Sequence, residues 1–177
     1  MYTIIGAGIG GLTTALSFER KGIPYQIFEK APELNEVGAG IWLAPNALQV
    51  LESLKVLKDV FDKGNSIDRI TIGKSDLSPI SDSNQDFIKA KFGFTTIAIH
   101  RADLQKLLFD KIPKEKIFLN KGFHSFKELN SENIEVMFDD NTSIETKYLI
   151  GADGINSKVR NQLFPESCTR YSGQTCW

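Results

Sequence analysis

The feature that most constrains the fold is a glycine-rich turn close to the N-terminus. Residues 2–11 form a short apolar segment that leads into glycines at the spacing G-x-G-x-x-G, at Gly6, Gly8 and Gly11, with a further glycine at Gly10. In such a turn the first glycine permits the bend off a strand, the second leaves room for a pyrophosphate, and the third lets the next helix lie close to the sheet. The pattern predicts a dinucleotide site, although an ordinary βαβ unit with a glycine turn would share it.

The segment that follows the turn strengthens this prediction. Leu12, Ala15 and Leu16 have the spacing of one helix face, and the pattern stops before Gly22. A strand over residues 25–28 then ends at Glu29, close to the offset of about 20 residues at which a carboxylate meets an adenosine ribose. Such a carboxylate accepts hydrogen bonds from the ribose hydroxyls and repels a 2′-phosphate. We therefore expect FAD or NAD rather than NADP in the tight site.

Composition excludes several other classes of function. The chain has 177 residues, which suits one domain or one domain plus part of another. Its 21 basic and 22 acidic residues give a net charge of -1, which provides no electrostatic case for binding nucleic acid or an anionic membrane. No apolar run approaches the roughly 20 residues of a membrane span, and we expect a soluble, cytoplasmic protein. Two cysteines, Cys168 and Cys176, do not predict a metal site.

A second glycine cluster lies at Gly38 and Gly40, just before Ile41. We expect a loop here, either a plain one or one that lies along a flavin, because glycine allows close approach of the backbone to a flat group. Trp42 follows, and we interpret it as a packed aromatic residue, with a cofactor contact as the alternative. A helix is expected from Pro45 onward.

Residues 66–99 depart from the βαβ rhythm. Alternating segments at 69–73 and 92–99 predict strands, and residues 75–86 read as a polar connection between them. This antiparallel excursion belongs to a second layer or domain. Residues 170–177 look like the beginning of another strand.

The helix that follows carries an informative cation. Arg101 lies in its first turn, where a positive charge opposes the helix dipole at a cost of roughly 0.3–1 kcal/mol. Its counter-charge is either Asp103 or solvent, or a bound phosphate or flavin. Gln105 lies one turn further and could donate to the same ligand.

The last third of the chain predicts a meander and a second ligand-facing strand end. Segments at 117–119, 122–126, 134–138 and 143–146 alternate with polar turns and read as the meander. A strand over 147–151 then leads to Asp153 and Gly154, at the carboxyl end of a parallel sheet, where ligands bind in such folds. Asp153 either faces the nucleotide or caps its own turn.

Three segments together resemble a known family: residues 6–11 with Glu29, residues 38–47, and residues 149–160. They are similar to FAD-dependent monooxygenases of the single-component aromatic hydroxylase type, such as salicylate hydroxylase, zeaxanthin epoxidase and para-hydroxybenzoate hydroxylase. The resemblance implies an α/β fold: a Rossmann-like FAD-binding domain of the glutathione-reductase type, with a parallel sheet, a β-meander and a partial antiparallel excursion. Residues 1–177 would be the N-terminal portion of this domain, and residues 66–99 and 170–177 would supply strands of an incomplete substrate domain.

The resemblance also implies a role for each candidate residue, and it assigns no catalytic side chain. The glycine turn would cradle the FAD pyrophosphate, Glu29 would hold the adenosine ribose with Lys30 beside it, and Arg101 would reach the phosphate and ribityl region. Asp153 and Gly154 match a motif linked to both FAD and NAD(P)H. The full set of cofactor-binding candidates is Gly6, Gly8, Gly10, Gly11, Glu29, Lys30, Gly40, Ile41, Arg101, Gln105, Asp153 and Gly154.

The implied activity is hydroxylation of an aromatic or similar small organic substrate with O₂, with NAD(P)H as the transient reductant of tightly bound FAD. Enzymes of this type continue for about as long again, with a second Gly-Asp flavin motif and a substrate-binding sheet. We therefore expect an N-terminal fragment that binds FAD weakly and does not turn over alone. Two alternatives remain open: an FAD-dependent reductase or dehydrogenase of the same fold, such as the geranylgeranyl reductase type, and a non-catalytic dinucleotide-binding module.

Overall fold

A computed structural model describes residues 1–34 and 39–174 of the chain. The chain divides into two compact units, one made of residues 1–34 and 109–177 and the other of residues 35–108. Each unit has its own sheet and its own buried core, and each is described by itself below.

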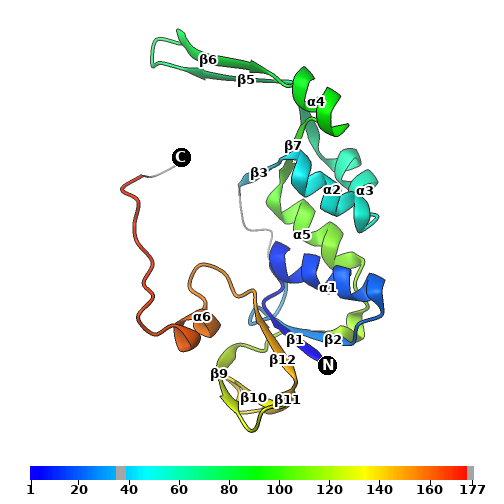
Figure 1. Ribbon diagram of the computed structural model, residues 1–177, viewed down its shortest axis with the longest axis vertical. Coiled ribbons are helices and arrows are strands. Elements are labelled where there is room, and N and C mark those ends of the chain that lie inside the picture. The colour runs from blue at the N-terminus through cyan, green and yellow to red at the C-terminus, as the bar shows by residue number, and fades with distance from the viewer. Residues whose placement is uncertain (35–38, 175–177) are drawn as a thin grey trace. The chain divides into compact units, whose positions relative to one another are not determined.

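The first unit is built on a parallel sheet. Its strands lie in the order β12-β1-β2-β8, and each neighbouring pair is parallel. All four strands therefore end at the same edge of the sheet, which is where ligands bind in folds of this kind. Figure 1 shows this sheet beside helix α1. The strands are β1 (Tyr2–Ile5), β2 (Tyr25–Phe28), β8 (Ile117–Phe118) and β12 (Tyr148–Gly151).

Helix α1 (Ile9–Lys21) covers one face of this sheet. Leu12, Ala15 and Leu16 are buried, as their helical spacing predicts, because they form the face that packs on the strands. The helix ends at Gly22, whose φ of 63° is left-handed and therefore favours glycine.

The other face of the sheet is covered by a β-meander and a short helix. The meander consists of β9 (Phe123–Glu128), β10 (Ile134–Phe138) and β11 (Ser143–Thr146), all antiparallel, and the helix is α6 (Lys158–Leu163). The buried core between these elements consists of Ile5, Phe28, Phe123, Val136, Phe138 and Val159. The unit thus has three layers, with the parallel sheet in the middle.

One strand of this region differs from the expectation. The sequence places residues 117–119 in the meander, and that is wrong, because β8 pairs in parallel with β2 and so belongs to the main sheet. The aromatic ring of Phe118 stacks on Phe28 with centroids 4.9 Å apart. β8 follows a 3₁₀ turn, η1 (Lys114–Lys116). A two-residue strand is too short for its apolar pattern to indicate which sheet it joins.

The second unit contains a small antiparallel sheet with the order β3-β7-β4. Its strands are β3 (Gly40–Leu43), β4 (Asn65–Ile67) and β7 (Thr96–His100), and its helices include α2 (Pro45–Ser53), α3 (Leu57–Lys63) and α5 (Arg101–Asp110), whose last residues pass into the first unit's sequence. The buried apolar residues of the unit are Leu43, Leu48, Leu51, Leu54, Val56, Val60, Ile97, Ile99, Leu104 and Leu108.

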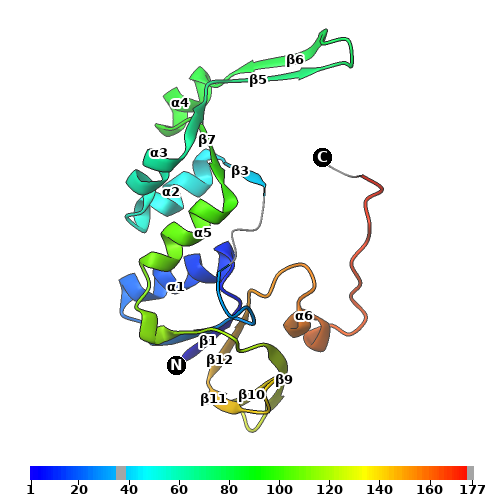
Figure 2. The ribbon, with the colours of Figure 1, turned by 180° about the vertical axis from the view of Figure 1, so that it is seen from behind.

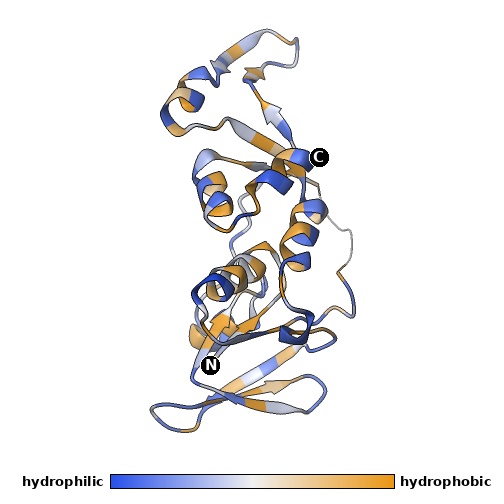
Figure 3. Cartoon of the chain, turned by 90° about the vertical axis from the view of Figure 1, so that its right-hand side faces the viewer, coloured by the Kyte–Doolittle hydropathy of each residue, from blue (hydrophilic) through white to orange (hydrophobic). Residues whose placement is uncertain are grey.

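The second unit also carries a hairpin, β5 (Arg69–Gly73) and β6 (Pro79–Asn84), followed by α4 (Asp86–Phe92). Figure 2 shows it as a two-stranded ribbon, and the hydropathy colouring of Figure 3 shows both polar and apolar residues in this part of the chain. The expectation of a polar connection over 75–86 is wrong, because β6 pairs with β5 through its backbone although all its side chains are exposed. The strand expected from residue 92 begins only at Thr96, because α4 ends at Phe92 and Gly93 turns the chain with a φ of 82°.

Residues 170–174 have no helix or strand, and residues 175–177 lie outside the described part of the chain. The strand expected over 170–177 therefore stays a prediction.

Candidate dinucleotide-binding site

The glycine turn lies between the end of β1 and the start of α1, and its glycines meet different surroundings. A Cβ on Gly6 would lie 2.4 Å from the carbonyl oxygen of Ala152, and Gly6 has a left-handed φ of 103°. A Cβ on Gly11 would lie 1.9 Å from the carbonyl oxygen of Gly6, so only glycine lets the helix approach the turn this closely. Gly8 and Gly10, in contrast, have no heavy atom within 4 Å of such a Cβ.

The N-terminus of α1 opens on the same side. Gly8 is the N-cap residue with φ -71° and ψ 177°, no side chain caps the helix, and the first turn carries no acidic residue. The first N–H groups of a helix have no acceptor within it, and the helix dipole makes this end positive. An anionic group can therefore approach the turn without competition from a carboxylate of the helix itself.

Glu29 is held beside the turn by backbone hydrogen bonds. Its Oε2 accepts from Ala7 N at 2.7 Å, and its Oε1 accepts from Ala31 N at 3.0 Å. The carboxylate therefore stays at the carboxyl end of β2, where its remaining lone pairs can accept hydrogen bonds from a ligand's hydroxyl groups. Lys30 follows directly and is exposed.

Asp153 follows the carboxyl end of β12. Its Oδ1 accepts from Ser157 Oγ at 2.6 Å and its Oδ2 accepts from Val159 N at 3.3 Å. The carboxylate thus caps its own turn, and it also lines the pocket described next. Gly154 has a φ of 84°, which favours glycine, and has open space beside its Cα.

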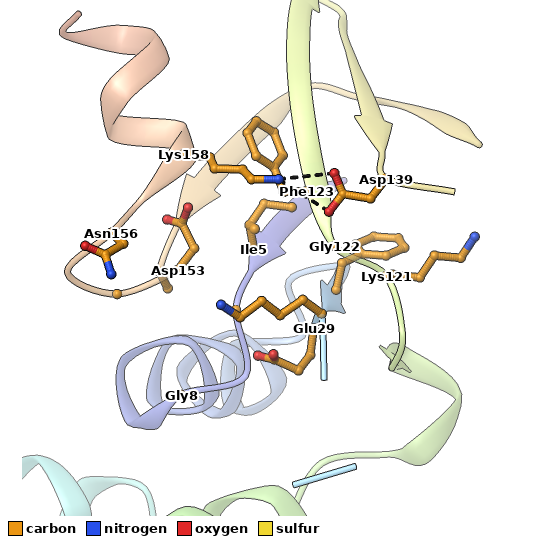
Figure 4. Close-up of a pocket in the computed structure, with 15 residues that line it drawn as sticks. Ile5, Gly8, Glu29, Lys121, Gly122, Phe123, Asp139, Asp153, Asn156 and Lys158 are labelled. Atoms are coloured by element: carbon orange, nitrogen blue, oxygen red, sulfur yellow. Dashed lines mark hydrogen bonds and ion pairs between the residues drawn. The ribbon is translucent and has the colours of Figure 1, made fainter. Parts of the chain in front are cut away.

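A pocket of about 250 Å³ lies at the carboxyl edge of the parallel sheet (Figure 4). It contains two of the turn glycines, Glu29 and Lys30 on one side, and the segment from Ala152 to Lys158 on another. Its volume falls below the roughly 300–1,000 Å³ of sites that hold a whole drug-sized ligand, so it suits one end of a dinucleotide. Its lining residues are Ile5, Gly6, Gly8, Phe28, Glu29, Lys30, Lys121, Gly122, Phe123, Asp139, Ala152, Asp153, Gly154, Asn156 and Lys158.

Nine of these lining residues were not predicted as site residues from the sequence: Ile5, Phe28, Lys121, Gly122, Phe123, Asp139, Ala152, Asn156 and Lys158. The nitrogen of Lys121 pairs with Asp140 and donates to Thr142 Oγ1 at 2.8 Å. Gly122 follows β8, whose carboxyl end lies at the same edge as those of β1 and β2. A correct assignment of β8 to the parallel sheet would have pointed to this segment.

The pocket's residues fit the adenosine and phosphate end of FAD. The open side of Gly8 and the uncapped helix start suit a pyrophosphate, and the fixed Glu29 carboxylate suits ribose hydroxyls. Gly6, Gly8, Glu29, Lys30, Asp153 and Gly154 all line this one pocket. Among the described residues no group of three or more His, Cys, Asp or Glu side chains could hold a metal ion.

Of the remaining candidates, Gly10 and Gly11 lie at the start of α1 and do not line the pocket, and the other four lie in the second unit. Gly40 pairs with His100 in the β3–β7 register, and Arg101 N donates to Ala39 O at 3.2 Å, so the start of β3 lies beside the start of α5. Ile41 lies next in β3, and Gln105 lies in α5. The loop expected around Gly40 is wrong in part: Gly38 lies outside the described residues, but Gly40 and Ile41 form a strand because β7 supplies their hydrogen-bond partners.

Two further side chains near this group bear on the sequence interpretation. Asp103 Oδ1 lies 3.7 Å from Lys63 Nζ, so its carboxylate has a cation partner of its own. Trp42 is 60% exposed, which overturns the expectation of a packed aromatic residue. The side chain lies on a short strand whose alternate residue, Leu43, enters the core.

Comparison with known families shows which family the chain belongs to. The family model for the FAD binding domain matches residues 2–172. The chain belongs to the FAD-binding domain family. The glycine turn, Glu29 and the Asp153 segment lie within the match, and FAD is the cofactor of this family.

Curated relatives of this FAD-binding chain are named as a monooxygenase and a hydroxylase. It is 36% identical over 174 residues to aurachin C monooxygenase/isomerase from Stigmatella aurantiaca, and 35% identical over 179 residues to 3-hydroxybenzoate 6-hydroxylase 1 from Aquipseudomonas alcaligenes. Each match covers 98% of this chain and 45% of the relative. The chain thus spans less than half the length of these relatives.

Solved structures agree with this family. The FAD-binding chain superimposes on Klebsiella pneumoniae HpxO complexed with FAD and uric acid with a TM-score of 0.79 and 25% identity, covering 91% of this chain and 41% of that one. A putative FAD-containing monooxygenase from Photorhabdus luminescens gives the same TM-score of 0.79 at 25% identity, over 93% of this chain and 42% of that one. The expected α/β class with a parallel sheet and an FAD-binding topology is confirmed. Within the described residues, no helix is long and apolar enough to span a membrane.

Proposed function

We propose that this chain is the FAD-holding part of a monooxygenase that uses NAD(P)H and O₂ to hydroxylate an aromatic or similar small organic molecule. The observation that carries this proposal is the identity of 35–36% over 98% of the chain to relatives named as a monooxygenase and a hydroxylase. The names of the relatives also support a small-molecule substrate, because one of them is called a 3-hydroxybenzoate hydroxylase. The need for NAD(P)H favours a cytoplasmic setting.

The pocket of the first unit holds the adenosine diphosphate part of FAD in this proposal. Backbone N–H groups at Gly8, Gly10 and Gly11 bind the pyrophosphate, and Gly6 gives the turn its shape. The support is the open space beside Gly8 and Gly10 and the uncapped start of α1.

Two carboxylates and one cation complete this part of the site. Glu29 accepts hydrogen bonds from the ribose hydroxyls, and Lys30 offers a positive charge at the pocket's rim. Asp153 fixes the turn that carries Gly154, because its oxygens accept from Ser157 and from the backbone of α6. Gly154 then leaves room for the cofactor to pass.

The second unit supplies the remaining contacts in this proposal. Gly40 and Ile41 border the flavin, and Arg101 and Gln105 donate to the phosphate and ribityl region. The support is the hydrogen-bonded proximity of the β3 start and the α5 start within that unit. Bound FAD would supply the redox chemistry, taking electrons from NAD(P)H and passing one oxygen atom of O₂ to the substrate.

We assign residues 66–99, and with them 170–177, to a substrate domain that this chain contains only in part. Within the described residues β5 and β6 pair only with each other, and a two-stranded hairpin alone is marginally stable. Leu77 is 88% exposed, Ile80 63% and Ile72 58%. Several exposed apolar side chains on one hairpin suit a surface that another element covers.

Oxygen labelling in the protein that combines this chain with a substrate domain tests the reaction class. With NAD(P)H and ¹⁸O₂, a monooxygenase transfers one labelled oxygen atom to the product, which mass spectrometry detects. Reduction of the substrate without label would support the reductase alternative, and FAD binding without NAD(P)H oxidation would support the non-catalytic module. The 177-residue chain alone should bind FAD weakly and give no hydroxylated product.

A further inference from the structure

An ion pair joins two walls of the FAD pocket that come from distant parts of the chain. Lys158 Nζ lies 3.1 Å from Asp139 Oδ1 and 3.3 Å from Asp139 Oδ2 (Figure 4). Asp139 follows β10 of the meander, and Lys158 is the first residue of α6. Both residues line the pocket.

The Asp139 side of the pair is fixed by the meander. Asp139 N donates to Gly122 O at 2.8 Å, and a Cβ on Gly122 would lie 2.3 Å from Asp139 Oδ2. The carboxylate therefore lies against the bare Cα of a glycine, and a larger residue at position 122 would displace it from this place. His124 Nδ1 lies 3.4 Å from Asp139 Oδ1 and is a second cation when protonated.

The Lys158 side of the pair is fixed by the Asp153 turn. The neighbouring Ser157 donates to Asp153 Oδ1 at 2.6 Å and accepts from Arg160 N at 2.9 Å. A change in the position of Lys158 therefore changes the position of the turn that carries Asp153, because Ser157 is bonded to both. The pair holds this turn at a set distance from the meander.

The order of groups in FAD tells which part of the cofactor this end of the pocket receives. On the proposed function, the pyrophosphate lies at the start of α1 and the ribose at Glu29. Because adenine is attached beyond the ribose, it extends away from α1 toward Gly122, Phe123 and Asp139. The ion pair therefore lies where the adenosine end of the cofactor is enclosed.

We propose that Asp139 and Lys158 form a positioning pair that sets the affinity of the site for the adenosine diphosphate part of FAD. Their side chains are 51% and 55% exposed in the chain by itself, so water weakens the pair. A bound adenosine removes some of this water and strengthens the attraction between the two charges. Neither residue needs to bind the cofactor itself, because the pair acts by keeping the two walls at the width that the ligand fills.

The other cation on this wall does not have the same role. Lys121 pairs with Asp140 and Thr142, which lie in the turn between β10 and β11. Lys121 itself lies just before β9 of the same meander. That pair therefore stays within one wall, while the Asp139–Lys158 pair crosses between two.

The test is a double-mutant cycle on the 177-residue chain, with Asp139→Asn, Lys158→Gln and the combination. ADP and FAD binding are titrated by calorimetry, and each variant's thermal unfolding midpoint is measured without ligand. Glu132→Gln is the matched control, because Lys147 Nζ lies 3.3 Å from Glu132 in an exposed pair of the same unit that does not line the pocket. Lys158→Arg keeps the cation.

Each single variant should lower the affinity for ADP and for FAD by the same factor, about two- to fivefold. The double variant should bind no more weakly than either single variant. Glu132→Gln and Lys158→Arg should bind as the unaltered chain does, and the unfolding midpoints of all variants should stay close to that of the unaltered chain, because a half-exposed ion pair adds little stability. Affinities of Asp139→Asn and Lys158→Gln equal to that of Glu132→Gln would overturn the positioning role, as would single effects that multiply in the double variant. Failure of the unaltered chain to bind either ligand would overturn the proposed function itself, and the pair's role with it.

Discussion

Replacing Gly8 by valine separates ligand binding from folding at the glycine turn. Gly8 has φ -71° and ψ 177°, which any residue adopts, and no heavy atom lies within 4 Å of an added Cβ. Valine at this position therefore clashes with nothing in the protein. Its methyl groups instead enter the open space in front of the α1 N-terminus, where the pyrophosphate is proposed to lie.

The size of the two effects follows from these surroundings. Valine is a poorer N-cap than glycine by up to roughly 1 kcal/mol, and part of this is offset by the lower entropy of the unfolded chain. The unfolding midpoint should therefore shift by no more than about 4 °C. If valine prevents two charge-assisted hydrogen bonds to the pyrophosphate, each worth about 1.5–3 kcal/mol, affinity falls by about a hundredfold or more.

The assay compares FAD and ADP affinity with thermal unfolding for Gly8→Val and for Arg20→Val. Arg20 is exposed near the far end of the same helix and does not line the pocket, so it receives the same side chain without meeting the ligand. Arg20→Val should retain FAD. Gly8→Val with an affinity within threefold of the unaltered chain would refute the placement of the pyrophosphate at this turn.

Three further outcomes are expected. Gly11→Ala should unfold the first unit or lower its free energy of unfolding by several kcal/mol, because its Cβ would lie 1.9 Å from the carbonyl oxygen of Gly6. Circular dichroism measures this, and a variant as stable as the unaltered chain would contradict the close packing. Glu29→Ala should lower the free energy of unfolding in urea by about 1–3 kcal/mol, because two backbone N–H groups lose their acceptor. It should also lower the affinity for ADP, and unchanged values of both quantities would contradict the role of Glu29. Lys158 holds the pKa of the Asp139 carboxyl below its usual range, so this carboxylate adds stability above its unfolded pKa, and the contribution disappears as pH falls through the folded pKa. The stability difference between the unaltered chain and Asp139→Asn should accordingly shrink as pH is lowered from 7 to 2, and a constant difference would argue against the ion pair.

Much of the first unit follows from local sequence signals. The glycine spacing, the apolar face of the first helix and the carboxylate after the second strand each have a physical cause that acts within about 30 residues. Gly6 and Gly11 have their place because a side chain at either would meet a backbone carbonyl oxygen at 2.4 Å or 1.9 Å. The strands β9, β10 and β11 of the meander were expected for the same reason, because each pairs with its neighbour in the chain.

Other features depend on contacts between distant segments and could not be predicted from local patterns. β8 has only two residues, and its membership of the parallel sheet comes from pairing with β2, about 90 positions earlier in the chain. Asp139 reads as an ordinary turn residue until the fold brings Lys158 to it. The strand β6 has no apolar alternation, because all its side chains are exposed and its pairing is through the backbone.

A crystal structure of the 177-residue chain with bound FAD would test the central claim most directly. The account predicts the pyrophosphate within about 3.2 Å of backbone N–H groups at the start of α1, the ribose hydroxyls on Glu29, and the adenine between Gly122 and Asp139. A cofactor bound elsewhere on the chain, or with its pyrophosphate away from Gly8, would contradict it.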